Sequence, residues 1–242
     1  MLTAPQFSPA ALESVRERIV RAARQAGRNP DSICLVAVSK QHPGSMVRAA
    51  YEAGHRDFGE NYVQECLGKV DELGDLADLR WHFIGQLQAN KTREVAERFA
   101  WVHTVDRERI ASRLSAQRPH HAPPLQVLLQ VRLGDEPGKG GIPPESLPAL
   151  ANVVSTLPRI KLRGLMCIPP PAASFEAQRV PFRELQALLT RLNANGHQLD
   201  TLSMGMSDDL EAAIMEGATM VRVGTAIFGP RPRAAGDVPQ AG

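Results

Sequence analysis

Short apolar runs alternate with amphipathic segments along most of the chain. The runs have the length and composition of buried parallel strands, and turn residues bound them. They span residues 33–39, 57–60, 81–85, 101–105, 125–131, 162–168, 199–204 and 220–224. Helical periodicity marks residues 92–99, 181–193 and 208–216, and residues 9–26 form an amphipathic segment ahead of the first run. Gly196 and Gly217 follow two of these segments at positions typical of helix C-caps.

This alternation predicts an α/β fold with parallel βα units. Eight units in 242 residues give about 30 residues each, and eight is the number that closes a (βα)₈ barrel of the TIM type. The main alternative is an open doubly wound sheet, but its usual G-x-G-x-x-G turn follows none of the predicted strands. We expect one barrel domain over residues 1–229 with an extra N-terminal helix, and a disordered tail over residues 230–242.

Composition narrows the function classes. The 28 Lys and Arg residues nearly balance the 26 Asp and Glu residues, leaving a net charge of +2 that does not favour nucleic-acid binding. Cys34, Cys66 and Cys167 form no C-x-x-C pair, so a disulfide framework and a cysteine zinc site are not expected. Neither a metal site nor a membrane association is predicted, because no metal-ligand spacing and no apolar run of about 18 residues occurs. We expect a cytoplasmic protein.

The end of the first predicted strand carries a lysine. The side-chain period of two places Lys40 on the same face as Val36 and Val38. If that face points inward, the amine lies at the C-terminal mouth of the barrel, where barrel active sites form. Apolar walls would disfavour its ammonium form and prepare it to form an imine with an aldehyde. The alternative is a strand-end lysine that extends into solvent.

The segments after the seventh and eighth strands are rich in small residues and hydroxyl groups. LSMGMS (202–207) and VRVGTAIFG (221–229) expose backbone amides at the commonest phosphate position of (βα)₈ barrels. The alternative is ordinary turn chemistry, with Ser207 or Asp208 as an N-cap and Glu211 closing a capping box. An aldehyde-reactive lysine and a phosphate site across one barrel mouth together match the two ends of pyridoxal 5′-phosphate (PLP).

Arg222 supplies a third point of contact. It alternates with Val221 and Val223, so it faces the barrel axis if the valines face the helices. An unpaired guanidinium there would be very costly. Its partner is either a buried carboxylate or the pyridine nitrogen of a bound cofactor. An arginine cannot give up its proton, so it would keep that nitrogen unprotonated and make the ring a weaker electron sink.

Motifs distributed over most of the chain resemble one family. They are LVAVSK (35–40), FGENYVQE (58–65), WHFIGQLQANK (81–91), VHTVDR (102–107), LRGLMCIPP (162–170), LSMGMSDDLEAAI (202–214) and VRVGTAIFG (221–229). The chain resembles the pyridoxal phosphate homeostasis protein family, which is related to the N-terminal barrel of alanine racemase. The resemblance implies PLP held as an imine on Lys40, with its ring nitrogen facing Arg222. It also implies a phosphate site made by Ser203, Ser207, Gly224 and Thr225.

Other motif positions are less definite. Asn61, His82 and Met166 match motif positions at strand ends and are candidates for contacts with the cofactor ring. For each of them, packing or an indirect hydrogen bond is the alternative. Many relatives carry E-x-x-K-x-G after the fifth strand, and here Lys139 occupies that pattern within GKGG. We interpret this segment as a mobile loop, with a second aldehyde site at Lys139 as the alternative.

Three functions compete. The first is a monomeric PLP-binding protein that stores or delivers the cofactor and does not catalyse a reaction robustly. PLP-dependent apoenzymes are its candidate recipients. The second is an amino-acid racemase, which needs a second acid/base that a tyrosine of the partner subunit's C-terminal domain supplies in the racemases. The tyrosines here, Tyr51 and Tyr62, fall on predicted early helices. The third is a PLP-free barrel lyase whose Lys40 forms an imine with a sugar-phosphate aldehyde.

Overall fold

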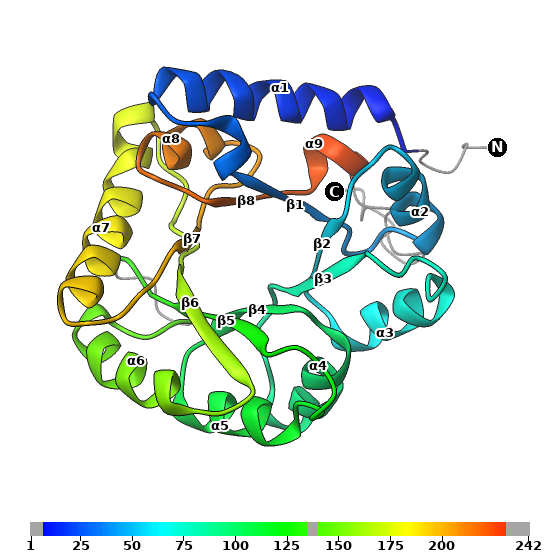
Figure 1. Ribbon diagram of the computed structural model, residues 1–242. Coiled ribbons are helices and arrows are strands. Elements are labelled where there is room, and N and C mark those ends of the chain that lie inside the picture. The colour runs from blue at the N-terminus through cyan, green and yellow to red at the C-terminus, as the bar shows by residue number, and fades with distance from the viewer. Residues whose placement is uncertain (1–6, 135–139, 231–242) are drawn as a thin grey trace, which may run out of the picture.

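Eight parallel strands close into a barrel with the helices outside it (Figure 1). This computed structural model describes residues 7–134 and 140–230. The strands pair in sequence order, and β8 pairs with β1 to close the ring. Their bounds are β1 Cys34–Val38, β2 Asp57–Glu60, β3 Arg80–Phe83, β4 Trp101–Val105, β5 Leu125–Gln130, β6 Ile160–Met166, β7 Thr201–Ser203 and β8 Met220–Val223. The predicted (βα)₈ fold is confirmed, and every strand agrees with its apolar run to within two residues.

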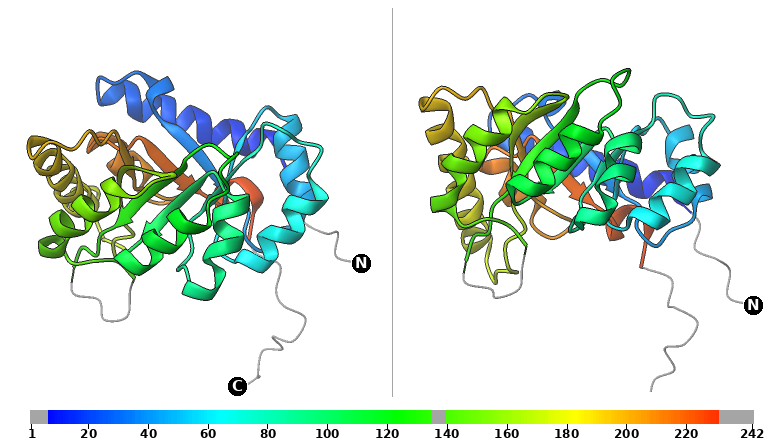
Figure 2. Two further views of the ribbon diagram at one scale, coloured as in Figure 1. Left: turned by 60° about the horizontal axis from the view of Figure 1, so that its bottom comes forward. Right: turned by 90° about the horizontal axis from the view of Figure 1, so that it is seen from below.

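The helices form the outer layer of the barrel. They are α1 Pro9–Gln25, α2 Gly44–Glu52, α3 Val63–Glu72, α4 Thr92–Arg98, α5 Glu108–Gln117, α6 Leu147–Thr156, α7 Phe175–Ala194, α8 Leu210–Met215 and α9 Thr225–Phe228. Short 3₁₀ turns cover Pro30–Ser32, Ala89–Lys91 and Pro144–Ser146. The additional helix α1 lies against α8 and α9, outside β8 and β1 (Figures 1 and 2). Within the described ranges, no helix is both long and apolar enough to cross a membrane.

Helix α7 begins earlier than predicted. The sequence suggested a start at Pro181, since proline suits the first helical position. The structure corrects this: the helix begins at Phe175, and the hydroxyl of Ser174 caps it by accepting from the amide of Ala177 at 3.2 Å. Arg179 in this first part of the helix donates to Glu216 at 2.6 Å. The cap and this contact stabilise the turns ahead of the proline, which lies inside the helix.

The two faces of β1 enter different packing layers. Leu35 and Ala37 belong to the apolar cluster that joins the barrel to the helices. Val36 and Val38 are buried inside the barrel, and a Cβ on Gly59 would lie only 3.0 Å from the Val36 side chain. This arrangement confirms the predicted alternation, with the face of Val36 and Val38 directed toward the barrel axis.

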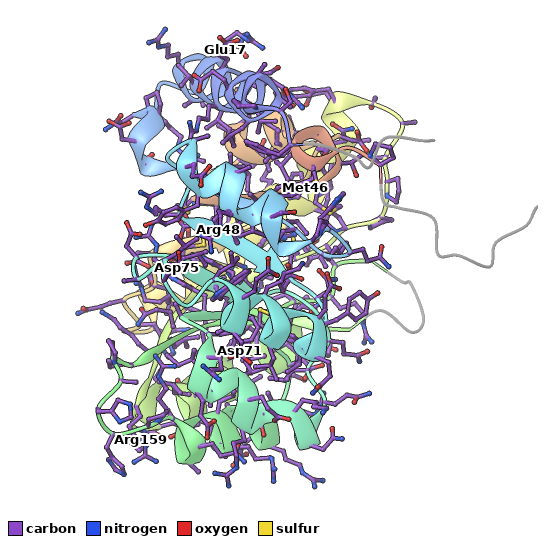
Figure 3. All side chains as sticks on the ribbon, turned by 90° about the vertical axis from the view of Figure 1, so that its right-hand side faces the viewer. Glu17, Met46, Arg48, Asp71, Asp75 and Arg159 are labelled. Atoms are coloured by element: carbon purple, nitrogen blue, oxygen red, sulfur yellow. The ribbon has the colours of Figure 1, made fainter. Side chains whose placement is uncertain are left out.

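Ion pairs link neighbouring elements on the outside of the barrel. Arg48 on α2 donates to both carboxylate oxygens of Asp75, at 2.7 and 2.8 Å (Figure 3). The side chain of Asp75 is 60% exposed, so water competes for this pair. Exposed pairs of this kind contribute little to stability.

A buried histidine makes stability depend on pH. His55 packs edge-on against Phe58 and donates from Nε2 to the carbonyl of Asp57 at 2.8 Å. Burial lowers the pKa of His55 to about 4, whereas an unfolded histidine titrates near pH 6.5. The unfolded chain therefore binds more protons between these values, and stability falls as the pH drops from about 6.5 to about 4.

We expect this histidine to contribute up to about 3 kcal/mol of acid destabilisation. Urea unfolding at several pH values measures how steeply the free energy of unfolding falls with pH. The His55→Gln variant keeps a donor for the carbonyl of Asp57 but does not titrate, so its stability should fall less over this window. Identical slopes for both proteins would show that His55 does not cause the effect.

Candidate functional site

A cavity of about 500 Å³ opens at the C-terminal mouth of the barrel. Its apolar wall includes Val38, Ile84 and Ile168. Six of the nine predicted site residues line it, namely Lys40, Asn61, Ser207, Arg222, Gly224 and Thr225. These residues come from segments up to 185 positions apart, so the fold brings the predicted lysine, cation and hydroxyl groups to one place.

Carboxylates bind the residues on both sides of Lys40. The hydroxyl of Ser39 donates to Glu60 Oε1 at 2.6 Å, and the amide of Gln41 donates to Glu65 Oε1 at 2.5 Å. Gln41 has a φ of 63°, in the left-handed region that residues other than glycine rarely adopt. These contacts stabilise the sharp turn that directs the chain away from β1 immediately after Lys40.

Lys69 joins the two carboxylates. Its ammonium donates to Glu60 Oε1 at 2.6 Å, to Glu65 Oε1 at 2.8 Å and to the carbonyl of Ser39 at 2.8 Å. We call Glu60, Glu65 and Lys69 the Lys69 cluster. Burial raises the pKa of Glu60, although the Lys69 charge and the Ser39 hydroxyl oppose this. The cluster supports the segment that carries Lys40 from below, with Glu60 and Lys69 buried and Glu65 partly exposed.

Arg222 is a buried cation at the cavity wall. Its Nη1 donates to Ser203 Oγ at 2.7 Å and its Nη2 donates to the carbonyl of Cys167 at 2.9 Å. Burial lowers the pKa of its guanidinium. Neither hydrogen bond goes to a carboxylate, so the structure does not support the alternative in which a buried acid is its partner. Arg222 therefore presents positive charge to the cavity.

The loops after β7 and β8 form another part of the cavity. Ser207 and Thr225 contribute hydroxyl groups, and α9 begins at Thr225 directly after Gly224. A Cβ on Gly224 would lie 3.1 Å from the carbonyl oxygen of Val38. Glycine therefore allows β8 and β1 to approach closely at the mouth.

Arg18 also lines this cavity, although sequence reasoning did not single it out. Its Nη2 donates to the carbonyl of Ser207 at 2.8 Å, and its Nε donates to Glu211 Oε1 at 2.7 Å. The alternative interpretation, a capping box closed by Glu211, does not form: α8 begins at Leu210, and Glu211 binds Arg18. No local pattern marks Arg18, because it is one of several arginines on α1. The additional helix thus supplies a cation beside the Ser207 loop.

The other three predicted site residues lie deeper in the barrel and are absent from the cavity lining. His82, Met166 and Ser203 each have 0% exposure. The hydroxyl of Ser203 lies between Arg222 and His103. Its oxygen is hydrogen-bonded to Arg222 Nη1 at 2.7 Å and to His103 Nδ1 at 2.8 Å. Their arrangement favours the alternative interpretations of packing and indirect hydrogen bonding for His82 and Met166.

Two predicted features fall outside this account. The predicted tail over residues 230–242, apart from Pro230, and the loop lysine Lys139 lie outside the described residues. Of the tyrosines, Tyr51 is on α2 and Tyr62 directly precedes α3. Neither tyrosine lines the cavity that contains Lys40.

The cavity has groups for a ligand with three distinct ends. Lys40 offers an amine, Arg222 offers donors to a neutral acceptor, and the Ser207 and Thr225 hydroxyl groups suit an anion. Asn61 Oδ1 is buried and has no hydrogen-bond partner in the described part of the protein. A ligand that brings a donor would satisfy it. The volume is also within the range of small-molecule sites.

The closed barrel and its lysine-bearing mouth define the alanine racemase type of barrel, and residues 11–232 match the family model described as "Alanine racemase, N-terminal domain". Curated relatives narrow this class. The chain is 59% identical over 220 residues to the pyridoxal phosphate homeostasis protein of Pseudomonas aeruginosa, covering 91% of this chain and 94% of that protein. Identity to the protein of the same name from Escherichia coli K12 is 52%, covering 91% and 95%. The chain belongs to the pyridoxal phosphate homeostasis protein family.

Solved structures agree with this assignment. PipY of Synechococcus elongatus, determined with PLP bound, is 40% identical with a TM-score of 0.78, covering 88% of this chain and 100% of PipY. Alanine racemase of Clostridium difficile 630 has a TM-score of 0.71 at 16% identity, covering 96% of this chain but 60% of the racemase. This last likeness shows the shared barrel fold.

Proposed function

We propose that this protein binds PLP as an imine on Lys40 and acts in PLP homeostasis rather than in robust catalysis. The single observation that carries the proposal is that Lys40, Arg222, Ser207 and Thr225 line one cavity. Family membership supports the same function. We further propose that it works in the cytoplasm as a monomer and supplies PLP-dependent apoenzymes.

The residues of the cavity fit the parts of PLP. When bound, PLP supplies an aldehyde carbon that a lysine amine can attack and a ring that accepts electrons. Arg222 would donate to the ring nitrogen and, because a guanidinium does not release its proton, leave that nitrogen unprotonated. Ser207, Thr225 and Arg18 would bind the phosphate. Asn61 Oδ1 would accept a hydrogen bond from the ligand.

The position of the tyrosines argues against racemisation. A racemase needs a second acid/base on the opposite face of the ring. Tyr51 donates its hydroxyl to Asp78 on the outside of the barrel, and Tyr62 is 55% exposed. Neither lines the cavity, so within the described residues no tyrosine is placed for that role.

Spectroscopy and turnover together test this function. We expect the purified protein to take up PLP, to develop imine absorbance, and to keep the cofactor on Lys40 after borohydride reduction, as peptide mapping would show. Incubation with L-alanine should produce little D-alanine. A colourless protein that takes up no PLP would favour the barrel lyase, and rapid, stereochemically controlled turnover of alanine would establish the racemase.

A further inference from the structure

A line of buried polar side chains runs through the barrel interior behind Arg222. Ser203 Oγ lies 2.8 Å from His103 Nδ1, His103 Nε2 lies 3.0 Å from His82 Nδ1, and His82 Nε2 lies 2.9 Å from Asp57 Oδ1. Including Arg222, the line crosses five strands, β8, β7, β4, β3 and β2. All five side chains belong to residues no more than 8% exposed.

The far end of this line is an ionised carboxylate. Arg80 donates to Asp57 Oδ1 at 2.7 Å and to Oδ2 at 2.6 Å. Burial alone would raise the pKa of Asp57, but the hydrogen bonds from Arg80 and His82 outweigh it and hold the pKa well below its usual value. An ionised carboxylate only accepts hydrogen bonds. His82 must therefore donate to it from Nε2.

This end point fixes the direction of every other hydrogen bond. Burial lowers the pKa of both His82 and His103 below the usual value, so at pH 7 each ring is neutral and carries one N–H. Since His82 uses Nε2 to donate, its Nδ1 accepts from His103 Nε2. The Nδ1 atom of His103 then accepts from the hydroxyl of Ser203. The single O–H of Ser203 is thus used to donate to His103. Toward Arg222 the Ser203 oxygen can only accept a hydrogen bond.

We propose that Ser203, His103, His82 and Asp57 form a directed relay that positions Arg222 toward the ring nitrogen of the cofactor, an inference that rests on the proposed binding of PLP. Because the O–H of Ser203 points toward His103, the lone pairs of Ser203 Oγ point toward Arg222 and accept its hydrogen bond. Together with the carbonyl of Cys167, that oxygen holds two guanidinium nitrogens. These contacts, on the side of the guanidinium away from the cavity, set its orientation there, and no carboxylate of the described residues is hydrogen-bonded to it.

A purely structural role predicts different behaviour. His82 stacks parallel to Trp101, with ring centroids 5.7 Å apart, so the histidines could simply fill the barrel interior. In that case, a substitution in the relay would weaken the binding of every ligand by the same factor. A relay that acts through Arg222 should affect only ligands that have a ring nitrogen for the guanidinium to contact.

The first experiment compares PLP with its deaza analogue, in which a C–H group replaces the ring nitrogen. Ser203→Ala should weaken the binding of PLP about tenfold, the size expected for disturbing one hydrogen bond to a charged group. Binding of the deaza analogue should change less than about twofold. Ser115→Ala is the matched control, because this buried serine donates to the carbonyl of Pro158, away from the cavity. It should leave the ratio of the two affinities unchanged.

The second experiment needs no cofactor. Nitrogen-15 NMR of the histidine side chains in the apoprotein at pH 7 should show neutral rings protonated at Nε2 for His82 and His103. A proton on Nδ1 of either ring, or a cationic ring, would overturn the directed relay. If Ser203→Ala weakened the binding of PLP and of the deaza analogue by the same factor, the inference that the relay acts through Arg222 would be overturned. If the wild-type protein binds neither ligand, the proposed function fails, whereas the tautomers still decide whether the relay exists.

Discussion

Replacing Lys40 with alanine is expected to abolish the imine absorbance completely. The amine is the only atom of this side chain that can form the covalent link, and Lys40 lines the cavity with Arg222 and Thr225. Titration of the apoprotein with PLP, followed by borohydride reduction and peptide mapping, measures the loss. The fold should survive because only a cavity-lining side chain is removed. The circular dichroism spectrum should therefore match that of the wild type.

The chain offers a matched control for this variant. Lys161 is an exposed lysine on β6, and Lys161→Ala should keep the full imine absorbance. Lys69 is a poor substitute for Lys40 despite its proximity, because its ammonium donates to three oxygen atoms of the Lys69 cluster and Ser39. An unchanged spectrum in Lys40→Ala would mean that another lysine carries the aldehyde.

Replacing Lys69 with methionine is expected to lower the free energy of unfolding by about 3–5 kcal/mol at pH 7, the usual cost of breaking a buried ion pair. Lys69 and Glu60 are 2.6 Å apart and almost fully buried. Removing the cation leaves a carboxylate in the interior without its counter-charge, and also frees the carbonyl of Ser39. Urea unfolding gives the difference. Weaker PLP binding should accompany it, since the segment that carries Lys40 loses its support.

Two further variants separate a charge effect from general damage. Adding Glu60→Gln to Lys69→Met removes the uncompensated charge and should recover part of the lost stability. Arg48→Met breaks the exposed pair with Asp75 (Figure 3) and should have a much smaller effect. If Lys69→Met lost no more stability than Arg48→Met, the Lys69 cluster would not be the support described above.

The sequence predicted the barrel well because its signal is local. Each strand is a short apolar run, and the alternation within the first of them placed Lys40 correctly at the mouth. The start of α7 was missed because Pro181 is a strong local signal, whereas the cap at Ser174 and the contact between Arg179 and Glu216 determine the actual start.

The internal arrangement of the site was less accessible from sequence. Ser203 and His103 are 100 residues apart and come from strands that are not neighbours. Their hydrogen bond depends on the closure of the barrel, which no local pattern encodes. The same holds for Arg18, whose partners Ser207 and Glu211 lie almost 200 residues away. Motif matching identified important positions, but it could not distinguish the cavity wall from the interior behind it.

The chemical state of the cysteines bears on how selectively an aldehyde reacts with this protein. Burial raises the pKa of Cys34 and of Cys167 to about 12, and it also raises the pKa of Cys66. Only a thiolate is an effective sulfur nucleophile, so at neutral pH about one molecule in 10⁵ would carry a thiolate at Cys34 or Cys167. The protein is therefore chemoselective: an aldehyde that enters meets an amine without competition from its sulfur atoms.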